Sequence, residues 1–478
     1  MTPLGDVTAL ADSYDLVVIG AGPAGMAAAT LAAGKGASTL LVDENPGPGG
    51  QIYRGITTTP LQEKALLGVD YWRGDAIATA FRNSEAAYLP SATVWQAAKG
   101  FELGISAHGK TRMIHARRVI GATGALERPF PIPGWTLPGV MTAGAAQTLL
   151  KASGIAMDGR VVLAGSGPLL WLIAAQYLAA GRPIEAILDT TPRGNWRHAV
   201  GGIAGFATSP YLRKGLGLLL KVRRSVKVVS GVTAIEAQGH ARLETVRYTS
   251  GGRETVIPVD HLLLHQGVVP NVNLASSMGC EIVWDDVQAA FCPKVDGFGE
   301  TSVEGFAIAG DGAGIAGAEA AAERGRLAAL GALAALGRFT AVQRDEAAGP
   351  IRAVLNRYDK GRGFLDALYR PAPQFRVAAD DAIACRCEEV TGGQVRDAVT
   401  RLGVTGPNQL KSFLRCGMGP CQGRLCGLTI TETIAEARGV SPEAVGYYRL
   451  RAPIKPITLA ELASLEKADE EVRMVARG

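Results

Sequence analysis

The chain has 478 residues, enough for about three domains of roughly 150 residues each, so it is not a small scaffold held together by disulfides. Its 47% hydrophobic and 19% charged residues are typical of a folded globular protein and exclude intrinsic disorder. The net charge of +5, from 49 basic and 44 acidic residues, is spread along the chain. We therefore expect neither nucleic acid nor anionic lipid as a partner.

The N-terminal region contains Asp6, Asp12 and Asp15. It has neither the basic start nor the apolar stretch followed by a small-residue cleavage site that are typical of a signal peptide. Two uncharged runs, 16–34 and 161–181, approach the length that crosses a bilayer. Each run is interrupted by Gly-Pro and is typical of a buried strand followed by a helix. These patterns predict a cytoplasmic protein without a transmembrane segment.

The first motif is a strand over 16–19, a glycine turn at Gly20, Gly22 and Gly25, a helix, and a second strand that ends at Asp43 and Glu44. This order of elements is typical of a dinucleotide-binding fold. Gly22 allows backbone N–H groups to approach a pyrophosphate at the helix N-terminus, and Gly25 allows the helix to pack against the strand. Glu44 or Asp43 is expected to accept hydrogen bonds from ribose hydroxyls.

A second copy of this motif lies 145 residues further along the chain, with glycines at Gly165 and Gly167 and an acidic strand end at Asp189. Gly165 to Asp189 spans the same 24 positions as Gly20 to Glu44, so Asp189 is expected to correspond to Glu44. Leu170 stands where the third glycine is expected, so a pyrophosphate would lie differently there or be absent. The spacing predicts either a second nucleotide, with Arg193 compatible with a 2′-phosphate, or a fold that has lost its ligand.

Two further segments are typical of strands that lead into turns: 119–124 ends in Ala-Thr123-Gly124, and 305–311 ends in Gly310-Asp311. Together with the glycine turns, they resemble the two-dinucleotide flavoproteins, a superfamily that includes glutathione and thioredoxin reductases. The resemblance implies a Rossmann-like α/β fold that binds FAD. The residues expected at FAD are Gly20, Gly22, Gly25, Asp43, Glu44, Gly50, Gln51, Thr123, Gly124, Gly310 and Asp311.

The chain departs from those reductases because it has no cysteine before Cys280. The segment 49–54 stands near the place where one of those families carries a redox-active cysteine pair. Disulfide exchange at the flavin is therefore excluded. Cys280 and Cys292 are interpreted as core thiols.

The remaining five cysteines lie between 385 and 426, a density that indicates metal or cluster ligation in a protein without a signal peptide. They resemble the bacterioferritin-associated ferredoxin (BFD) type of [2Fe-2S] domain. This resemblance selects four ligands and leaves one alternate: Cys385, Cys387, Cys421 and Cys426, with Cys416 as the alternate. Tetrahedral zinc and free thiols remain open as alternatives.

The combination of a two-dinucleotide flavoprotein without a redox-active cysteine pair, this cysteine motif and the tail from Arg451 resembles the alpha-type subunits of heteromeric FAD-dependent amine and imino acid dehydrogenases. That family includes the A chain of opine oxidase, the alpha chains of D-hydroxyproline and proline dehydrogenases, the B chain of hydrogen cyanide synthase and the alpha chain of sarcosine oxidase. The resemblance implies a partner of the amino acid oxidase type, a beta chain that contains FAD, and a small third chain in some members. It also implies, in some members, FMN at an interface between chains and NAD(P) or ATP in the second fold.

We expect five parts in the chain: a discontinuous FAD domain (14–125 and 270–338), a second dinucleotide domain (126–269), a helical linker (339–375), the BFD-like domain (376–445) and a tail (446–478). Gly349-Pro350 and the prolines at 371 and 373 are expected to punctuate the linker. The proline-broken tail is too polar for a core strand, so it should pack on the FAD domain or on another subunit.

No nucleophile–histidine–acid or paired-carboxylate pattern emerges, so the catalytic residues stay unassigned. His261 and His265 lie four residues apart in an expected strand and are interpreted as core histidines rather than as a metal pair. The resulting hypothesis is an electron-transfer flavoprotein subunit that passes electrons from a partner's FAD, which oxidises the C–N bond of an opine, hydroxyproline, proline or related amino acid. The alternatives are a self-sufficient NAD(P)H-dependent reductase and a non-redox scaffold that binds a nucleotide and zinc.

Overall fold

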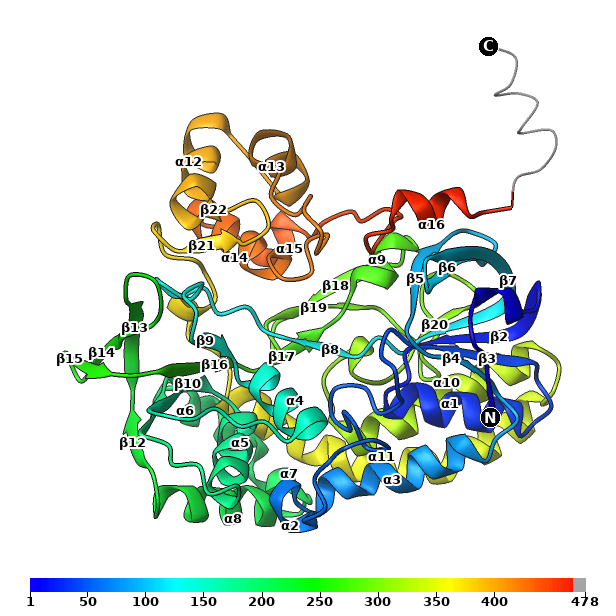
Figure 1. Ribbon diagram of the computed structural model, residues 1–478, viewed down its shortest axis with the longest axis horizontal. Coiled ribbons are helices and arrows are strands. Elements are labelled where there is room, and N and C mark those ends of the chain that lie inside the picture. The colour runs from blue at the N-terminus through cyan, green and yellow to red at the C-terminus, as the bar shows by residue number, and fades with distance from the viewer. Residues whose placement is uncertain (467–478) are drawn as a thin grey trace.

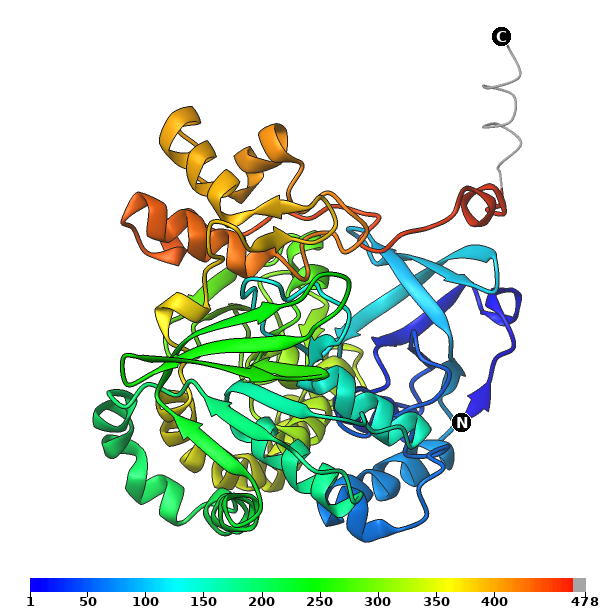
Figure 2. The ribbon, with the colours of Figure 1, turned by 60° about the vertical axis from the view of Figure 1, so that its left-hand side comes forward.

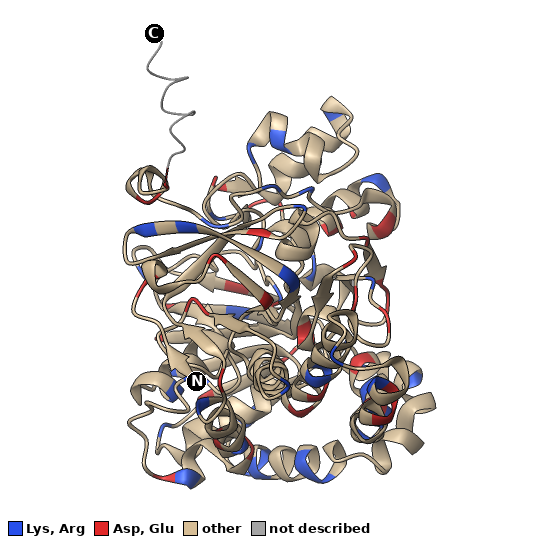
Figure 3. Cartoon of the chain, turned by 90° about the vertical axis from the view of Figure 1, so that its right-hand side faces the viewer, with Lys and Arg blue, Asp and Glu red and all other residues tan. Residues whose placement is uncertain are grey.

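The computed structural model describes residues 1–466, so the end of the expected tail, 467–478, lies outside the described residues. Figure 1 shows two α/β units side by side, with a small helical domain above them. Each unit is a β-sheet together with its helices, and the two are called the first layer and the second layer below. The α/β architecture expected from the two glycine motifs is confirmed. Figure 3 shows basic and acidic residues interspersed along the ribbon.

The first layer is an eight-stranded sheet. Its strands, in spatial order, are β1 (Thr2–Pro3), β4 (Ala87–Leu89), β3 (Thr39–Val42), β2 (Ser13–Ile19), β7 (Lys110–Gly121), β6 (Glu102–Ala107) and β5 (Ala92–Ala97), and β20 (Phe306–Ile308) also pairs with β7. The strands around β2 are parallel, whereas β5, β6 and β7 form an antiparallel meander. The first 13 residues also belong to this layer, through β1 and the short helix η1 (Val7–Ala9).

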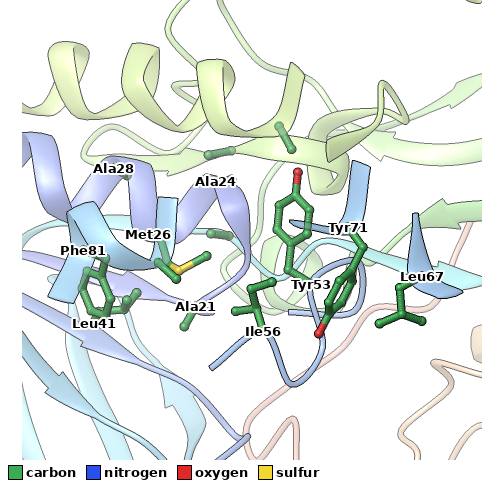
Figure 4. Packing of buried hydrophobic residues seen from close by; sticks show 14 of the residues in the cluster. Ala21, Ala24, Met26, Ala28, Leu41, Tyr53, Ile56, Leu67, Tyr71 and Phe81 are labelled. Atoms are coloured by element: carbon green, nitrogen blue, oxygen red, sulfur yellow. The ribbon is translucent and has the colours of Figure 1, made fainter. Parts of the chain in front are cut away.

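Helices α1 (Pro23–Ala33), α3 (Val69–Arg82) and α10 (Ala318–Ala335) cover one face of this sheet (Figure 1). The helix α1 is rich in alanine and is buried nearly all round, which is expected of a helix between a sheet and another helix. Figure 4 shows Met26 of α1 close to Phe81 of α3, and Tyr53 beside Tyr71, in the same apolar cluster as Leu67 of the short helix α2 (Lys64–Leu67).

The second layer is a five-stranded parallel sheet with a three-stranded antiparallel sheet beside it. The parallel strands are β12 (Lys227–Ser230), β11 (Ala186–Asp189), β10 (Val161–Ser166), β16 (His261–Gln266) and β9 (Val140–Thr142); the antiparallel ones are β13 (Val232–Gln238), β14 (Thr245–Ser250) and β15 (Arg253–Pro258). The helices are α4 (Ala143–Ser153), α5 (Pro168–Ala179), α6 (Asn195–Ala199), η2 (Val200–Gly202), α7 (Ile203–Ala207) and α8 (Tyr211–Arg223). Strands β8 (Ala125–Glu127) and β17 (Val268–Pro270) pair where the chain crosses between the two layers.

The chain returns to the first layer through α9 (Asn273–Ser277), β18 (Ile282–Asp285), β19 (Ala290–Pro293) and η3 (Gly310–Ala313). The linker is then one long helix, α11 (Ala341–Leu368), followed by η4 (Pro373–Phe375). The expectation that Gly349-Pro350 interrupts the linker is wrong, because α11 continues through Pro350. A capping box at Thr340 and a buried stripe that includes Leu355 and Phe364 hold the helix together although the proline removes one hydrogen bond.

The small domain consists of β21 (Ile383–Cys385), β22 (Val390–Thr391), α12 (Gly392–Leu402), α13 (Pro407–Leu414), α14 (Gly427–Arg438) and α15 (Pro442–Val445). Its own apolar core includes three of the cysteines. After it the chain crosses the first layer and ends the described part in α16 (Leu459–Ala463), as Figures 1 and 2 show. The two uncharged runs, 16–34 and 161–181, form the strand and helix pairs β2–α1 and β10–α5. Among the described residues, no helix combines the length and the apolar character needed to span a bilayer.

Candidate functional site

The first glycine turn is shaped by close contacts that only glycine permits. Gly20 has a φ of +107°, and a Cβ at this position would lie 2.4 Å from the carbonyl oxygen of Ala122. A Cβ on Gly25 would lie 1.8 Å from the carbonyl oxygen of Gly20. The helix α1 therefore starts directly against the strand, and its first N–H groups face the space beyond the turn.

The two acidic residues at the end of β3 have different surroundings. Asp43 is buried and accepts hydrogen bonds from the backbone N–H groups of Ala21, at 2.5 Å, and Asn45, at 2.7 Å. Burial raises the pKa of the Asp43 carboxyl, and these two bonds oppose the shift. Glu44 is half-exposed and pairs with Lys455 of the tail. Asp43 thus stabilises the turn, which leaves Glu44 as the carboxylate available to a ligand.

A cavity of about 1240 Å³ lies between the two layers and runs from the first glycine turn to the second. This volume exceeds the range of about 300–1000 Å³ usual for a small-molecule site. Most of the residues expected at FAD line it: Gly20, Gly22, Asp43, Glu44, Gly50, Gln51, Thr123, Gly124, Gly310 and Asp311. Gly25 is not among the lining residues, because it faces the strand.

The segment 49–54 forms a tight turn opposite the first glycine motif. Gly50 has a φ of +60°, and a Cβ there would lie 2.8 Å from the Cα of Gly22. The buried Lys151, on α4 of the second layer, donates hydrogen bonds to the carbonyl oxygens of Gln51, at 3.3 Å, and Ile52, at 2.9 Å. No sequence pattern pointed to this lysine, since it belongs to a different layer.

Asp311 lies in η3, directly after β20. Its Oδ1 accepts hydrogen bonds from the backbone N–H groups of Ala316, at 2.8 Å, and Gly317, at 3.1 Å. Its other carboxylate oxygen takes no protein hydrogen bond among the described residues, and Asp311 lines the cavity. The residue is therefore fixed in place and keeps one acceptor atom for a ligand.

The second glycine turn resembles the first at its first glycine, where both have a positive φ, but differs at its second glycine, since Gly22 has a φ of −72°. Gly165 has a φ of +136° and Gly167 a φ of +122°, but only Gly167 lines the cavity. Leu170, in place of a third glycine, is buried in the core.

The strand register corrects the expected equivalence of Asp189 and Glu44. Asp189 pairs with Gly165, whereas Val42 pairs with Ile19, so the counterpart of Asp189 is Asp43. The helix after the second turn has 12 residues, whereas the helix after the first has 11. Because of this additional residue, equal spacing along the sequence aligned Asp189 with Glu44 instead of with Asp43. Thr190 occupies the position of Glu44, and it is buried and bonded to Gln266.

A buried histidine and a carboxylate lie beside the second turn. Nδ1 of His265 is 2.6 Å from Oε1 of Glu127, and this carboxylate also accepts a bond from the N–H of Gly144, at 2.9 Å. Both residues line the cavity. The interpretation of His265 as a hydrogen-bonded buried histidine agrees with this geometry. Four residues along a strand separate it from His261 by about 13 Å, too far for a shared metal ion.

The five clustered cysteines come together in the small domain. The Sγ atoms of Cys385, Cys416 and Cys426 all lie within 4.8 Å of one another, and these residues are buried. Cys421 lies beside Cys426 and the exposed Cys387, so all five cysteines gather in one region. Cys416, expected as the alternate ligand, thus lies in the buried part of the group.

Glycines leave room for the backbone around these thiols. A Cβ on Gly419 would lie 2.2 Å from the Cβ of Cys387, and one on Gly417 would lie 2.6 Å from the ring of Tyr448. Thiols that lie so close together and are enclosed by backbone are suited to bind an iron–sulfur cluster as thiolate ligands. Cys280 lies elsewhere, in the core of the first layer, and Cys292 is partly buried on β19; burial raises the pKa of each thiol.

A buried ion-pair group joins the small domain to the cavity wall. Glu432 of α14 lies 2.7 Å from Nη1 of Arg376 and 3.5 Å from Nη1 of Arg128. Arg128 follows β8 and also lines the cavity. In addition, Nδ2 of Asn273 donates to the carbonyl oxygen of Gln422, at 3.1 Å, in the cysteine loop. The cysteine domain is therefore held directly against the cavity.

Comparisons with known proteins agree with these two sites. Residues 14–325 match the family of pyridine nucleotide-disulphide oxidoreductases, and residues 383–436 match the BFD-like [2Fe-2S] binding domain. The L-proline dehydrogenase structure from P. horikoshii is similar to the chain, with a TM-score of 0.71 and 18% identity, over 96% of this chain and 80% of that one. The chain is therefore an oxidoreductase with FAD and a [2Fe-2S] cluster as its cofactors.

Full-length relatives define the family more narrowly. The A chain of the opine oxidase of Agrobacterium tumefaciens (strain Ach5) is 50% identical, over 98% of this chain and 95% of its own length. The HcnB chain of the hydrogen cyanide synthase of Pseudomonas aeruginosa is 32% identical, over 94% and 98%. The alpha chain of the sarcosine oxidase of Rhizobium meliloti (strain 1021) is 27% identical, and the match spans 42% of its length. This protein belongs to the family of opine oxidase A chains.

Proposed function

We propose that FAD occupies the cavity between the two layers, with its pyrophosphate at the first glycine turn and its adenosine ribose at Glu44. The turn offers free N–H groups at the start of α1, and Glu44 is the only one of the two strand-end acids that does not serve the turn. Asp311 offers a fixed carboxylate oxygen for hydroxyl groups of the flavin chain. The close approach of Gly50 to Gly22, both of which line the cavity, supports this placement, because a side chain on Gly50 would push against the glycine turn.

The ligands proposed for the [2Fe-2S] cluster are Cys385, Cys387, Cys421 and Cys426. Each loop contributes a close pair, and the contact of Cys421 with both Cys387 and Cys426 links the two pairs. Cys416 is the alternate, and its burial in the same group means that substitution must decide between the two sets.

The proposed function is that of an electron-transfer subunit in a heteromeric dehydrogenase or oxidase. FAD accepts a pair of electrons and a [2Fe-2S] cluster passes them singly, so both together suit a relay. The observation that carries this proposal is the contact between the two sites: Arg424, between Cys421 and Cys426, lines the same cavity as Glu44. The two proposed redox sites thus share residues of one cavity lining, which supports a relay between them.

We further propose a partner subunit that contains its own FAD, resembles amino acid oxidases and removes hydride from the C–N bond of an opine or a related amino acid. The names of the relatives, as parts of oxidases or of a synthase, support this assignment. Co-expression with an amino acid oxidase-like chain from the same genome tests it. The expected result is a stable complex that oxidises octopine or nopaline, whereas the isolated chain does not.

The second fold favours one alternative, a self-sufficient NAD(P)H-dependent reductase, because the cavity reaches its glycine turn at Gly167. Thr190 in the place of Glu44 weakens this alternative, since no carboxylate stands there for a ribose. Rapid mixing of the isolated chain with NADH separates the two functions: fast loss of flavin absorbance supports the reductase.

NAD(P) or ATP at Gly167, and FMN at an interface between chains, stay proposals. The match to a [2Fe-2S] family favours iron over the zinc of the scaffold hypothesis.

A further inference from the structure

We propose that the tail segment 450–456, here called the strap, forms part of the FAD site, and that Lys455 positions Glu44 for the ribose. This inference rests on the proposed placement of FAD at Glu44. The inference adds to the FAD site a segment from the opposite end of the sequence, since 411 residues separate Lys455 from Glu44.

The strap is anchored to the first layer on both sides of Lys455. The N–H of Ile454 donates to the carbonyl oxygen of Trp95, at 2.8 Å, next to the sheet edge at β5. The side chain of Ile454 is buried in the core of that layer. Further along, the Oγ of Ser464 accepts a bond from the N–H of Thr111, at 2.9 Å. Figures 1 and 2 both show the tail crossing above β5 and β6.

The strap also starts from the cysteine domain. Tyr448 donates from its hydroxyl to the carbonyl oxygen of Cys416, at 3.0 Å, and the Oγ of Ser276 donates to the carbonyl oxygen of Tyr448, at 2.9 Å. Leu450 is buried at this junction. The strap is therefore held at one end by the cluster domain and at the other by the FAD layer.

Lys455 contacts both oxygens of Glu44. Its Nζ lies 2.5 Å from Oε1 and 2.7 Å from Oε2. A carboxylate can accept about four hydrogen bonds, so this contact leaves acceptor positions for ribose hydroxyls while it fixes the side chain. An otherwise half-exposed glutamate would have to lose its rotamer freedom when FAD binds, and Lys455 removes that cost in advance.

The charge of the strap also suits the ligand. Lys455 and Arg424 both line the cavity near Glu44, and together they offset the negative charge of that carboxylate. A diphosphate ligand enters such a site more readily when the nearby acid is neutralised. Arg424 comes from the cysteine loop, so the strap and the cluster domain act on the same end of the cavity.

The test is a titration of FAD into the flavin-free full-length protein, in which binding is measured by the quenching of flavin fluorescence. Lys455→Ala and Glu44→Gln should each raise the FAD dissociation constant on the order of 10-fold. Lys455→Arg, which keeps the ion pair, should stay within about 3-fold. Lys294→Ala removes a comparable surface pair, with Glu281 at 3.0 Å, and should leave the constant unchanged. The double variant should resemble either single variant, because the two residues act as a unit.

The outcomes separate the two proposals. An unchanged or lower dissociation constant for Lys455→Ala, beside a raised one for Glu44→Gln, overturns the role of the strap. No effect of either substitution overturns the placement of FAD at Glu44. If Lys455→Ala does not fold, trypsin cleavage of the wild-type protein after Arg451 gives a second readout. FAD should slow this cleavage several-fold, and a rate that does not depend on FAD contradicts the proposal.

Discussion

Lys151 of the second layer donates a hydrogen bond of 2.9 Å to the carbonyl oxygen of Ile52 in the first, so one buried lysine side chain joins the two layers beside the cavity. Its Nζ also donates to Oε1 of Gln147, at 2.8 Å. The turn that carries Gln51 depends on this contact for its position.

The stability of the protein should therefore depend on pH through Lys151. Burial lowers the pKa of Lys151 from 10.5 to about 7. Between these values the unfolded chain binds one more proton than the folded one, so this group makes unfolding less favourable as the pH rises. Relative to Lys151→Met, the wild-type unfolding free energy should rise by about 1 kcal/mol per pH unit between about pH 7.5 and 9.5. Denaturant titrations at each pH measure it, and parallel profiles for the two proteins contradict it.

The ion pairs of Glu432 should hold the cysteine domain in place. Glu432→Gln leaves the guanidinium groups of Arg128 and Arg376 in a buried site without their counter-charge. The expected loss is about 3 kcal/mol in unfolding free energy. Glu436→Gln, on the same helix but paired with Arg396 at the surface, is the matched control and should change it by about 0.5 kcal/mol or less. Equal effects of the two substitutions would contradict the structural role of Glu432.

Serine substitutions should distinguish the cluster ligands from the fifth cysteine. Replacement of Cys387 or Cys421 should remove the visible absorbance of the cluster and most of the iron. Cys416→Ser should keep both, because the serine fills the same buried place beside Tyr448 without breaking a cluster bond. Iron analysis and absorbance spectra measure the outcome. Loss of iron from Cys416→Ser with retention in Cys387→Ser would instead assign Cys416 as the ligand.

Gly25→Ala should disrupt the first turn. The new Cβ would lie 1.8 Å from the carbonyl oxygen of Gly20, so the helix must move away from the strand. We expect a loss of about 3 kcal/mol and lower flavin content. Gly5→Ala, where nothing lies within 4 Å, is the control and should leave thermal unfolding unchanged. Wild-type stability in Gly25→Ala would show that the close packing of α1 is not required.

The glycine turns, the strands around them and the cysteine group could be predicted because each leaves a local signal: positive φ angles, close backbone approach or thiol spacing. Contacts between distant segments could not. Lys455 and Glu44 lie 411 residues apart, and Arg128 and Glu432 lie 304 apart, so only the folded topology brings them together. The register of Asp189 was missed because one additional residue in α5 shifts the strand without changing its pattern.

The most direct test of the relay is an anaerobic titration of the complex purified with its oxidase-like partner. Octopine, nopaline, D-hydroxyproline, proline, glycine and sarcosine are added in turn, and absorbance is followed for the flavin and for the cluster. We predict that one of these compounds bleaches the flavin and then lowers the cluster absorbance, and that the isolated chain does not respond to it. Reduction of the isolated chain by that same compound, or a cluster that stays oxidised in the fully reduced complex, would contradict the relay.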